Sequence, residues 1–432
     1  MKRHLLTGAI LIAVIGALGI GSALLEKKST VEAAAVQAPR FEVDPMWPKP
    51  LPNHWIMGNT IGVSVDSRDH VWIIHRGGSL EAKEVYATTN PPGSECCVPA
   101  PPVLEFDQEG NLVGHWGGQD GPGYVWPASN HGITVDFKGN VWIGGNGRAG
   151  VAAGPEEAGN APAAANQAKQ AATKGKAPPA GRGGAPNYHD SMVLKFTQDG
   201  KFLMAIGKAG TSGGSNDIEN LGLPAKTLVD PKTNELYVAD GYGNKRVIVF
   251  DTDTGKYKRH WGAYGNKPDD TNLGPYRPDA PVAQQFRNPV HCAELSRDGM
   301  VYVCDRVNDR IQVFTPEGKF VKEVFIAKNT LGDGSVWDIA FSKDPQQKYI
   351  YLADGANEKV YIMLRETLEI LTSFGDGGRQ PGQFYAVHSV ATDSKGNVYT
   401  TETYRGQRVQ RFMYKGLAAV TKKDQGVVWP KK

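Results

Sequence analysis

The chain has 432 residues, enough for one large domain or two ordinary ones, and its formal net charge is only +3. No stretch combines a basic stripe with interleaved aromatic residues, which argues against nucleic acid as a partner. The 52 glycines, 28 prolines and 9 tryptophans favour many short strands and turns over long helices.

Residues 1–38 are predicted to be an export signal or an N-terminal membrane anchor. The chain begins with the basic segment MKRH, residues 5–25 are almost wholly apolar, and residues 33–35 are three alanines that suit signal cleavage. An uncleaved anchor stays open, because about 20 apolar residues can cross a bilayer. Both alternatives predict an exported protein, periplasmic or secreted.

Export makes the four cysteines candidates for disulfides. Cys96 and Cys97 are adjacent, whereas Cys292 and Cys304 flank a predicted turn at 297–299. In an antiparallel hairpin the last two would lie opposite each other, close enough for a cross-strand bridge. Two buried free thiols are the open alternative.

One pattern recurs six times along the chain: a short apolar strand, a turn with Gly, Asp or Asn, and a second strand. The six copies are IGVSVDSRDHVWII, HGITVDFKGNVWIG, AKTLVDPKTNELYVAD, HCAELSRDGMVYVCD, WDIAFSKDPQQKYIYLAD and HSVATDSKGNVYTTE. Four copies continue into a third strand opened by a basic residue, as in NKRVIVF and NDRIQVF, and fourth strands follow several of them. Such a unit is typical of a β-propeller blade, which buries its faces by stacking on its neighbours.

The sequence therefore predicts an all-β fold, a six-bladed β-propeller over residues 39–432. The last blade has three evident strands, so we expect the N-terminal segment RFEVDPMWP to close it and remove an exposed edge. Residues 150–187, rich in Ala, Gly, Pro and Lys, are predicted to be a loop inserted between the second and third strands of the second blade. The third-strand pattern resembles the NHL-repeat propellers.

Three histidines occupy equivalent positions in alternate blades. The position lies five residues before the residue that ends each first strand. In chain order it holds Ile61, His131, Ala225, His291, Trp337 and His388. First strands line the central channel of a propeller, so the three imidazoles are expected to converge on the axis. Three neutral imidazoles suit Zn²⁺ and leave a position open for water or substrate. Channel histidines that hold only water are the alternative.

Further polar residues are expected at the same face, where the second strands end: Arg76, Tyr242 and Arg306. An arginine offers a planar fork to a substrate carboxylate. A tyrosine near a metal and two guanidiniums can act as a base, because the positive charges stabilise its phenolate. Structural roles stay open, such as an ion pair between Arg306 and Asp305.

Together the segments HRGG, HGITVD, DGYGN and VHSVATD resemble the peptidyl-α-hydroxyglycine α-amidating lyases. These six-bladed propellers cleave the N–Cα bond of a C-terminal α-hydroxyglycine into a peptide amide and glyoxylate. The resemblance implies Zn²⁺ on His131, His291 and His388, and Tyr242 as the base. It also implies Arg76 and Arg306 as substrate-binding arginines, and a small-molecule or peptide C-terminal substrate.

The chain departs from that family at two positions. Ser389 stands where the family has an aspartate that helps bind Ca²⁺, so calcium would need backbone carbonyls as ligands. Gly243 stands where the family has a cysteine after the catalytic tyrosine, so that disulfide is missing. The propeller prediction for residues 39–432 includes no copper monooxygenase, so we do not expect these residues to make the substrate as bifunctional enzymes do. Two alternatives stay open: a non-catalytic NHL propeller that binds protein or cell-wall partners, and a metal-dependent hydrolase of the lactonase kind, whose carboxylate and calcium sites fit three histidines less well.

Overall fold

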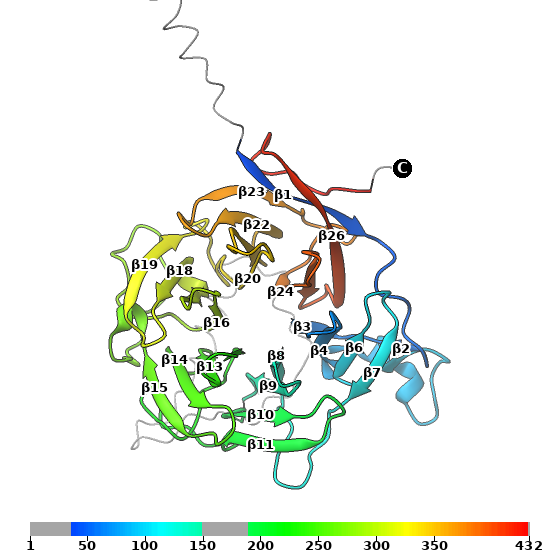
Figure 1. Cartoon of the computed structure of the whole chain (residues 1–432). Helices are drawn as coiled ribbons and strands as arrows, with labels where there is room; N and C mark the ends of the chain where they lie inside the picture. Colours follow the sequence, from blue (N-terminus) through cyan, green and yellow to red (C-terminus); the bar gives the residue numbers. More distant parts are fainter. Residues whose placement is uncertain (1–35, 149–188, 431–432) are drawn as a thin grey trace, which may run out of the picture.

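The computed structural model describes residues 36–148 and 189–430. They form six four-stranded antiparallel sheets set in a ring (Figure 1), which confirms the predicted six-bladed propeller. Helical turns among the described residues are 3-10 turns of three residues, and none of these residues belongs to a helix long and apolar enough to span a membrane. Residues 1–35 of the predicted export segment, and the predicted inserted loop at 150–187, lie outside the described residues.

Blades one to three follow one another in chain order, each with its first strand nearest the axis of the ring (Figure 1). Blade one consists of β3 (Asn59–Val65), β4 (Val71–Arg76), β6 (Val103–Phe106) and β7 (Leu112–Trp116). Blade two consists of β8 (Asn130–Val135), β9 (Val141–Gly145), β10 (Met192–Phe196) and β11 (Phe202–Gly207). Blade three consists of β12 (Lys226–Asp230), β13 (Glu235–Asp240), β14 (Arg246–Asp251) and β15 (Tyr257–Trp261). Strand β2 (Trp55–Ile56), which precedes blade one, and β5 (Val98–Pro99), which lies between β4 and β6 in the chain, form a small parallel pair.

Blades four to six complete the ring. Blade four consists of β16 (Val290–Leu295), β17 (Val301–Asp305), β18 (Arg310–Phe314) and β19 (Phe320–Phe325). Blade five consists of β20 (Asp338–Phe341), β21 (Tyr349–Asp354), β22 (Lys359–Leu364) and β23 (Ile370–Phe374). Blade six consists of β24 (Val387–Thr392), β25 (Val398–Glu402), β26 (Arg408–Ala419) and the N-terminal β1 (Gln37–Asp44).

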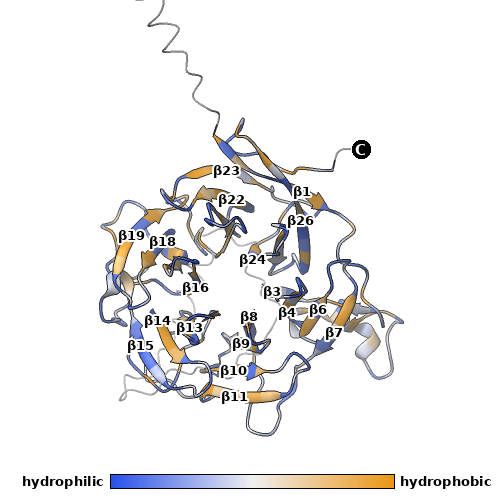
Figure 2. Cartoon of the chain, viewed as in Figure 1, coloured by the Kyte–Doolittle hydropathy of each residue, from blue (hydrophilic) through white to orange (hydrophobic). Residues whose placement is uncertain are grey.

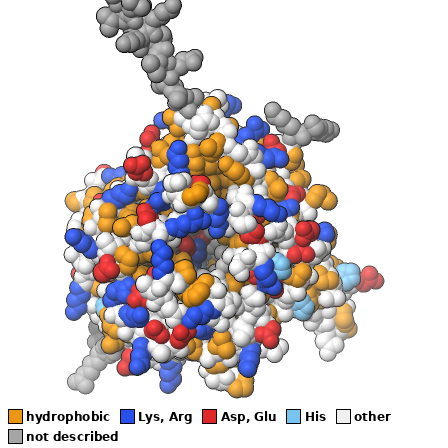
Figure 3. Space-filling model, viewed as in Figure 1, with side chains coloured by type: hydrophobic (Ala, Val, Ile, Leu, Met, Phe, Trp, Pro, Cys, Tyr) orange, Lys and Arg blue, Asp and Glu red, His pale blue; other side chains and the backbone are white. Residues whose placement is uncertain are grey.

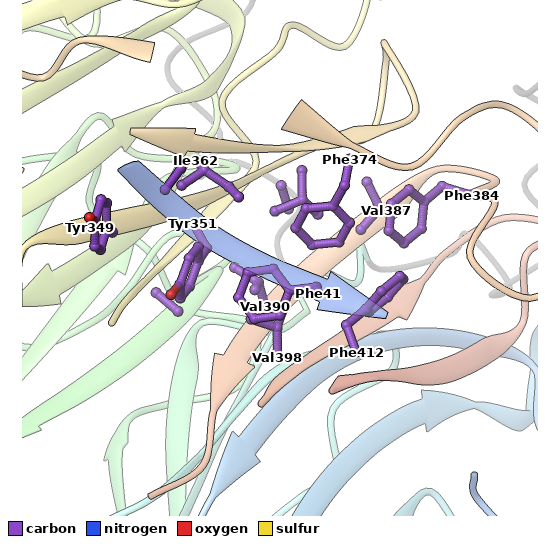
Figure 4. Close-up of a cluster of buried hydrophobic side chains, with 14 of the residues drawn as sticks. Phe41, Tyr349, Tyr351, Ile362, Phe374, Phe384, Val387, Val390, Val398 and Phe412 are labelled. Carbon is purple, nitrogen blue, oxygen red and sulfur yellow. The ribbon is translucent and has the colours of Figure 1, made fainter. Parts of the chain in front are cut away.

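The N-terminal strand closes the last blade, as predicted. Strand β1 pairs antiparallel with β26 and is the outermost strand of that sheet. Phe41 on β1 contacts Tyr351 of blade five edge-to-face and also packs on Phe374. Figure 4 shows this cluster of buried apolar side chains between blades five and six. The closing strand thus covers an edge and supplies core side chains to the interface of two blades.

The repeated Asp that ends a first strand explains the turn that follows it. The Asp136 carboxylate accepts hydrogen bonds from the backbone N–H of Asn140 at 2.8 Å and from Nε1 of Trp142 at 2.9 Å. Asp66 and Asp393 do the same in blades one and six. One carboxylate therefore fixes the turn and the aromatic side chain of the next strand. The hydrophobic residues lie mostly in the strands, and the connecting loops are mostly polar (Figure 2).

In blades three, four and six, the basic residue that opens the third strand pairs with the acid that ends the second. These pairs are Asp240–Arg246 at 2.8 Å, Asp305–Arg310 at 2.7 Å and Glu402–Arg408 at 2.6 Å. In the first pair both side chains are fully buried, and Arg246 also donates to the carbonyl oxygens of Ser215 and Asn220. A buried charge needs such partners, because burial in an apolar interior disfavours it.

Arg246→Met is expected to lower the free energy of unfolding by about 3–5 kcal/mol, because it leaves the Asp240 carboxylate buried without its partner. Denaturant unfolding measures this change. Lys138→Ala is the control: it removes a solvent-exposed ion pair with Asp253, and we expect less than about 1 kcal/mol. Equal effects of the two substitutions would contradict the structural role of the buried pair.

The structure decides between the two alternatives for the cysteines. Cys292 on β16 and Cys304 on β17 are cross-strand partners in the register of the sheet and are joined as a disulfide. Cys96 and Cys97 are joined to each other as well. The described residues contain no free cysteine.

Candidate metal centre and active site

The three histidines meet on the axis of the ring, as the repeat alignment predicts. Each is the second residue of a first strand, in β8, β16 and β24. His131, His291 and His388 are only 2–3% exposed, and their ring centroids lie 4.7–5.1 Å apart. One ring nitrogen of each lies within 4.8 Å of the others. A narrow cavity beside them is lined by first-strand residues of blades one, two, four and six and by the start of blade three.

A backbone carbonyl of the next blade holds each imidazole. Nδ1 of His131 bonds to the carbonyl oxygen of Ala225 at 2.8 Å, and Nδ1 of His388 bonds to that of Ile61 at 2.6 Å. Nδ1 of His291 bonds in the same way to the carbonyl oxygen of Trp337. A carbonyl only accepts hydrogen bonds, so Nδ1 carries the proton in all three rings. The lone pair is then on Nε2, the nitrogen free to bind a metal.

These three carbonyls occupy the same repeat position as the histidines. Ile61, Ala225 and Trp337 are the residues of blades one, three and five that align with the histidines of blades six, two and four. Blades that carry a histidine and blades that supply a carbonyl therefore alternate around the ring. The repeat alignment identifies all six positions. At the three positions without histidine the side chain does not indicate a role, because the group that binds the imidazole is the backbone carbonyl.

Burial keeps the three imidazoles neutral. Burial lowers the pKa of His131, His291 and His388 well below the ordinary value, and neighbouring positive charges add to this effect. The charge of Arg306 acts on all three, and that of Arg76 acts on His131 and His388. Neutral imidazole is the form that coordinates a metal. The donor set therefore fits a transition-metal ion with three nitrogen ligands and an open side.

Tyr242 and Arg306 lie at the open side of this group. The Tyr242 hydroxyl is 2.9 Å from Nε2 of His131 and 3.2 Å from Nε2 of His291. A guanidinium N–H of Arg306 donates to the same hydroxyl at 3.2 Å. Tyr242 follows β13, and Arg306 opens the 3-10 turn η6 (Arg306–Asn308) after β17. The ends of two second strands thus bring a hydroxyl and a cation to the histidines.

Arg306 does not pair with Asp305. The carboxylate of Asp305 bonds instead to Arg310, and Arg306 lies 3.5 Å from Asp333, whose side chain is 44% exposed. The Arg306 guanidinium also lies over the Trp337 ring, 4.4 Å from its centroid. Its Nε–H is buried and has no hydrogen-bond partner. Because Asp305 pairs with Arg310 and not with Arg306, the Arg306 guanidinium still has an N–H that can donate a hydrogen bond at the site.

Arg76, the last residue of β4, contacts the strand that carries His131. It donates from Nε to the carbonyl oxygen of Asn130 at 3.0 Å and from a terminal nitrogen to Oδ1 of Asn146 at 2.8 Å. Asn130 precedes His131 in β8. Arg76 therefore contributes positive charge near the site and braces the strand that carries a ligand.

Two residues near the site, Asp333 and Tyr404, were not predicted from the sequence, and the role of Trp337 was not either. Trp337 holds His291 through its carbonyl and stacks on Arg306. Asp333 contacts Arg306, and the Tyr404 hydroxyl donates to Asp333 at 2.9 Å. The repeat offered a signal for Tyr404, because TETYRGQR in blade six aligns with ADGYGNKR around Tyr242. Asp333 lies between blades and has no such signal.

Ser389 stands at the position that bears on calcium. Its hydroxyl donates to the carbonyl oxygen of Ile61 at 2.9 Å, the same oxygen that holds His388. The side chain is thus engaged in orienting a histidine. A calcium ion with backbone carbonyl ligands stays a prediction.

A second group of potential ligands, Asp66, His70 and Glu105, lies away from the axis in blade one. The Arg68 guanidinium contacts Asp66 at 2.6 Å and Glu105 at 2.7 Å. A permanent cation is already paired with both carboxylates, so the axial histidines are the better candidate for a metal centre.

Gly132→Ala is expected to weaken metal binding about 10-fold or more, a change typical when the partner of a ligand is displaced. A Cβ at Gly132 would lie 2.5 Å from the carbonyl oxygen of Ala225, the group that orients His131. Zinc competition with a chromophoric chelator measures the affinity. Gly377→Ala is the control, because the nearest atom to its added Cβ is 3.9 Å away. An unchanged affinity in the first variant would contradict the role of that carbonyl.

The chain is similar to amidating enzymes over part of its length. It is 27% identical over 207 residues to peptidyl-glycine alpha-amidating monooxygenase B of Xenopus laevis, covering 47% of this chain and 21% of the relative. Monooxygenase A of the same frog is 34% identical over 123 residues, which is 28% of this chain and 12% of the relative. The chain thus spans about a fifth or less of these relatives. The matches confirm that this NHL-repeat propeller resembles the lyase half of the amidating enzyme.

A longer and weaker similarity links the chain to a second relative. NHL repeat-containing protein 3 of Mus musculus is 23% identical over 346 residues, covering 76% of this chain and 71% of that protein. The solved structure of a streptogramin B lyase is 13% identical, covers 88% of this chain and 98% of its own, and superposes with a TM-score of 0.46. No protein-family model matches the chain.

Proposed function

We propose that this protein is a zinc-dependent lyase that cleaves the N–Cα bond of a C-terminal α-hydroxyglycine, giving an amide and glyoxylate. The observation that carries the proposal is the position of the Tyr242 hydroxyl, 2.9 Å from Nε2 of His131, 3.2 Å from Nε2 of His291 and 3.2 Å from Arg306. A metal site, a base and a carboxylate-binding cation thus share one small space. The partial similarity to amidating enzymes supports the same reading.

Zinc suits the three Nε2 donors, and when bound it would supply a Lewis acid that polarises a substrate oxygen. Tyr242, as phenolate, takes the proton from the carbinol hydroxyl. The electron pair of that O–H bond forms the new C=O bond, and the C–N bond breaks. The leaving amide nitrogen takes the proton back from Tyr242, so no external oxidant or reductant is needed.

The cationic surroundings support an anionic substrate. The positive charges of Arg306 and Arg76 both lie close enough to lower the pKa of His131 and His388. The buried Nε–H of Arg306 has no hydrogen-bond partner. A glycine-derived carboxylate would accept from such donors, since guanidinium–carboxylate bonds are strong and directional. Arg306 would also stabilise the phenolate of Tyr242 through the contact at 3.2 Å. The peptide or small molecule attached to that carboxylate, and export of the chain, stay predictions.

The deciding experiment joins metal analysis to product detection. The purified protein is expected to contain one zinc per chain and to release glyoxylate and benzamide from α-hydroxyhippurate. Chelation is expected to stop the release, and added Zn²⁺ to restore it. Bound zinc without glyoxylate would point to another zinc enzyme. A chain that binds no metal would favour a non-catalytic NHL propeller.

A further inference from the structure

A buried ion triad lies on the inner strands next to the histidines. The Lys226 ammonium contacts both oxygens of Asp338, at 2.7 and 2.9 Å, and Oε1 of Glu294, at 2.7 Å. The exposed fractions of these side chains are 12%, 1% and 16%. The three residues come from blades three, five and four, and Lys226 also lines the narrow cavity beside the histidines.

The triad is held together strongly. Burial alone would lower the pKa of Lys226, but the charges of Asp338 and Glu294 outweigh burial and raise it. Burial raises the pKa of Glu294 to about 7. The ammonium is therefore the cation that stabilises the buried Asp338 carboxylate, and its removal would leave that charge uncompensated.

Two members of the triad adjoin the carbonyls that orient two histidines. Lys226 follows Ala225, whose carbonyl oxygen holds Nδ1 of His131. Asp338 follows Trp337, whose carbonyl oxygen holds Nδ1 of His291. An ion pair between Lys226 and Asp338 thus fixes the spacing of two strands at the residues next to these two carbonyls.

The triad also reaches the strand of the third histidine. Oδ2 of Asp338 accepts a hydrogen bond from the backbone N–H of Val390 at 3.1 Å. Val390 lies two residues after His388 in β24. The other oxygen, Oδ1, accepts from the N–H of Ile339 at 2.9 Å, so the carboxylate is fixed on both sides.

We propose that Lys226 and Asp338 are positioning residues of the metal site, whose ion pair sets the three imidazoles at the separation that a metal ion requires. The inference rests on the metal site of the proposed function, and it does not depend on the reaction.

The test compares the Zn²⁺ affinity of metal-free variants by competition with a chromophoric chelator, without substrate. Lys226→Met is expected to weaken binding about 10–100-fold, the range found when groups behind metal ligands are lost. Asp338→Asn keeps the side-chain volume and an acceptor for Val390, and it is expected to weaken binding in the same direction. Both substitutions break the same ion pair. The fold-loss of Zn²⁺ affinity in the double variant is therefore expected to be much smaller than the product of the two single fold-losses.

Lys195→Met is the matched control. Lys195 is also a buried lysine, but its ammonium donates to the carbonyl oxygen of Thr252, away from the histidines. Its loss is expected to lower the unfolding temperature and leave Zn²⁺ affinity unchanged.

Wild-type Zn²⁺ affinity in folded Lys226→Met would overturn the inference. An equal loss of Zn²⁺ affinity in Lys195→Met would overturn it too. If Lys226→Met does not fold, the Zn²⁺ affinity of Asp338→Asn decides. A wild-type protein that binds zinc and shows this order of affinities, yet releases no glyoxylate, would leave the inference standing and remove the proposed lyase.

Discussion

Tyr242→Phe is expected to lower glyoxylate release from α-hydroxyhippurate by about 10²–10⁴-fold, the usual contribution of a general base, while zinc content stays at the wild-type level. The substitution removes one oxygen and keeps the ring. That oxygen is the hydroxyl shared by His131, His291 and Arg306. The effect is therefore expected in kcat, with the folded structure and the metal unchanged.

Tyr276→Phe is the control for the loss of a hydroxyl. The Tyr276 hydroxyl donates to the carbonyl oxygen of Lys328 at 2.9 Å on an exposed loop, so this variant should retain full activity. If Tyr242→Phe turns over as fast as the wild type, Tyr242 is not the base. If it loses zinc as well, Tyr242 acts on the metal site and its chemical role has to be assigned anew.

His291→Ala is expected to lose stoichiometric zinc and, with it, all measurable glyoxylate release. His291 supplies one of three Nε2 donors, and two imidazoles at these positions leave the ion short of the ligands that a protein zinc site uses. The His291 ring contacts those of His131 and His388, with centroids 5.1 and 4.7 Å away. Elemental analysis of the purified variant measures the metal directly.

A surface histidine provides the comparison for this variant. His115 lies on an outer strand and its ring contacts Trp55 edge-to-face at 4.8 Å. His115→Ala should keep one zinc per chain and wild-type turnover. Full zinc content in His291→Ala would remove the three-histidine site, and the lyase proposal with it.

The fold could be predicted from the sequence because each blade repeats the same local chemistry. Asp136 fixes its turn and Trp142 through side-chain contacts, and an Asp with an aromatic residue six positions later recurs in blades one and six. Equivalent positions in such a repeat become neighbours around the axis, so the sequence alone groups His131, His291 and His388. The carbonyls of Ile61, Ala225 and Trp337 could not, since any residue offers the same backbone oxygen.

The residues that escaped prediction form contacts between blades. Lys226 of blade three and Asp338 of blade five stand at equivalent repeat positions, one residue after the aligned Ala225 and Trp337, but the repeat does not tell that their side chains form an ion pair. Asp333 reaches Arg306 from a segment between blades. For Arg306 the sequence left an ion pair with Asp305 open, but the buried Arg310 takes that carboxylate. Pairing between blades depends on three-dimensional distances, and a linear repeat gives no measure of them.

The face seen in Figure 3 is hollowed near the middle of the ring, with Lys and Arg side chains around the hollow. On the axis, the bond from His388 to Ile61 crosses the seam between blade six and blade one, where the chain closes on itself. The same blade six is completed by β1, which comes from the other end of the chain. A metal ion bound by the three histidines would therefore stabilise the closed ring. Its binding free energy adds to the stability of the native ring, because the unfolded chain does not form the site. Opening of the seam between blades six and one should therefore release the ion, and the metal-loaded ring should unfold as one cooperative unit.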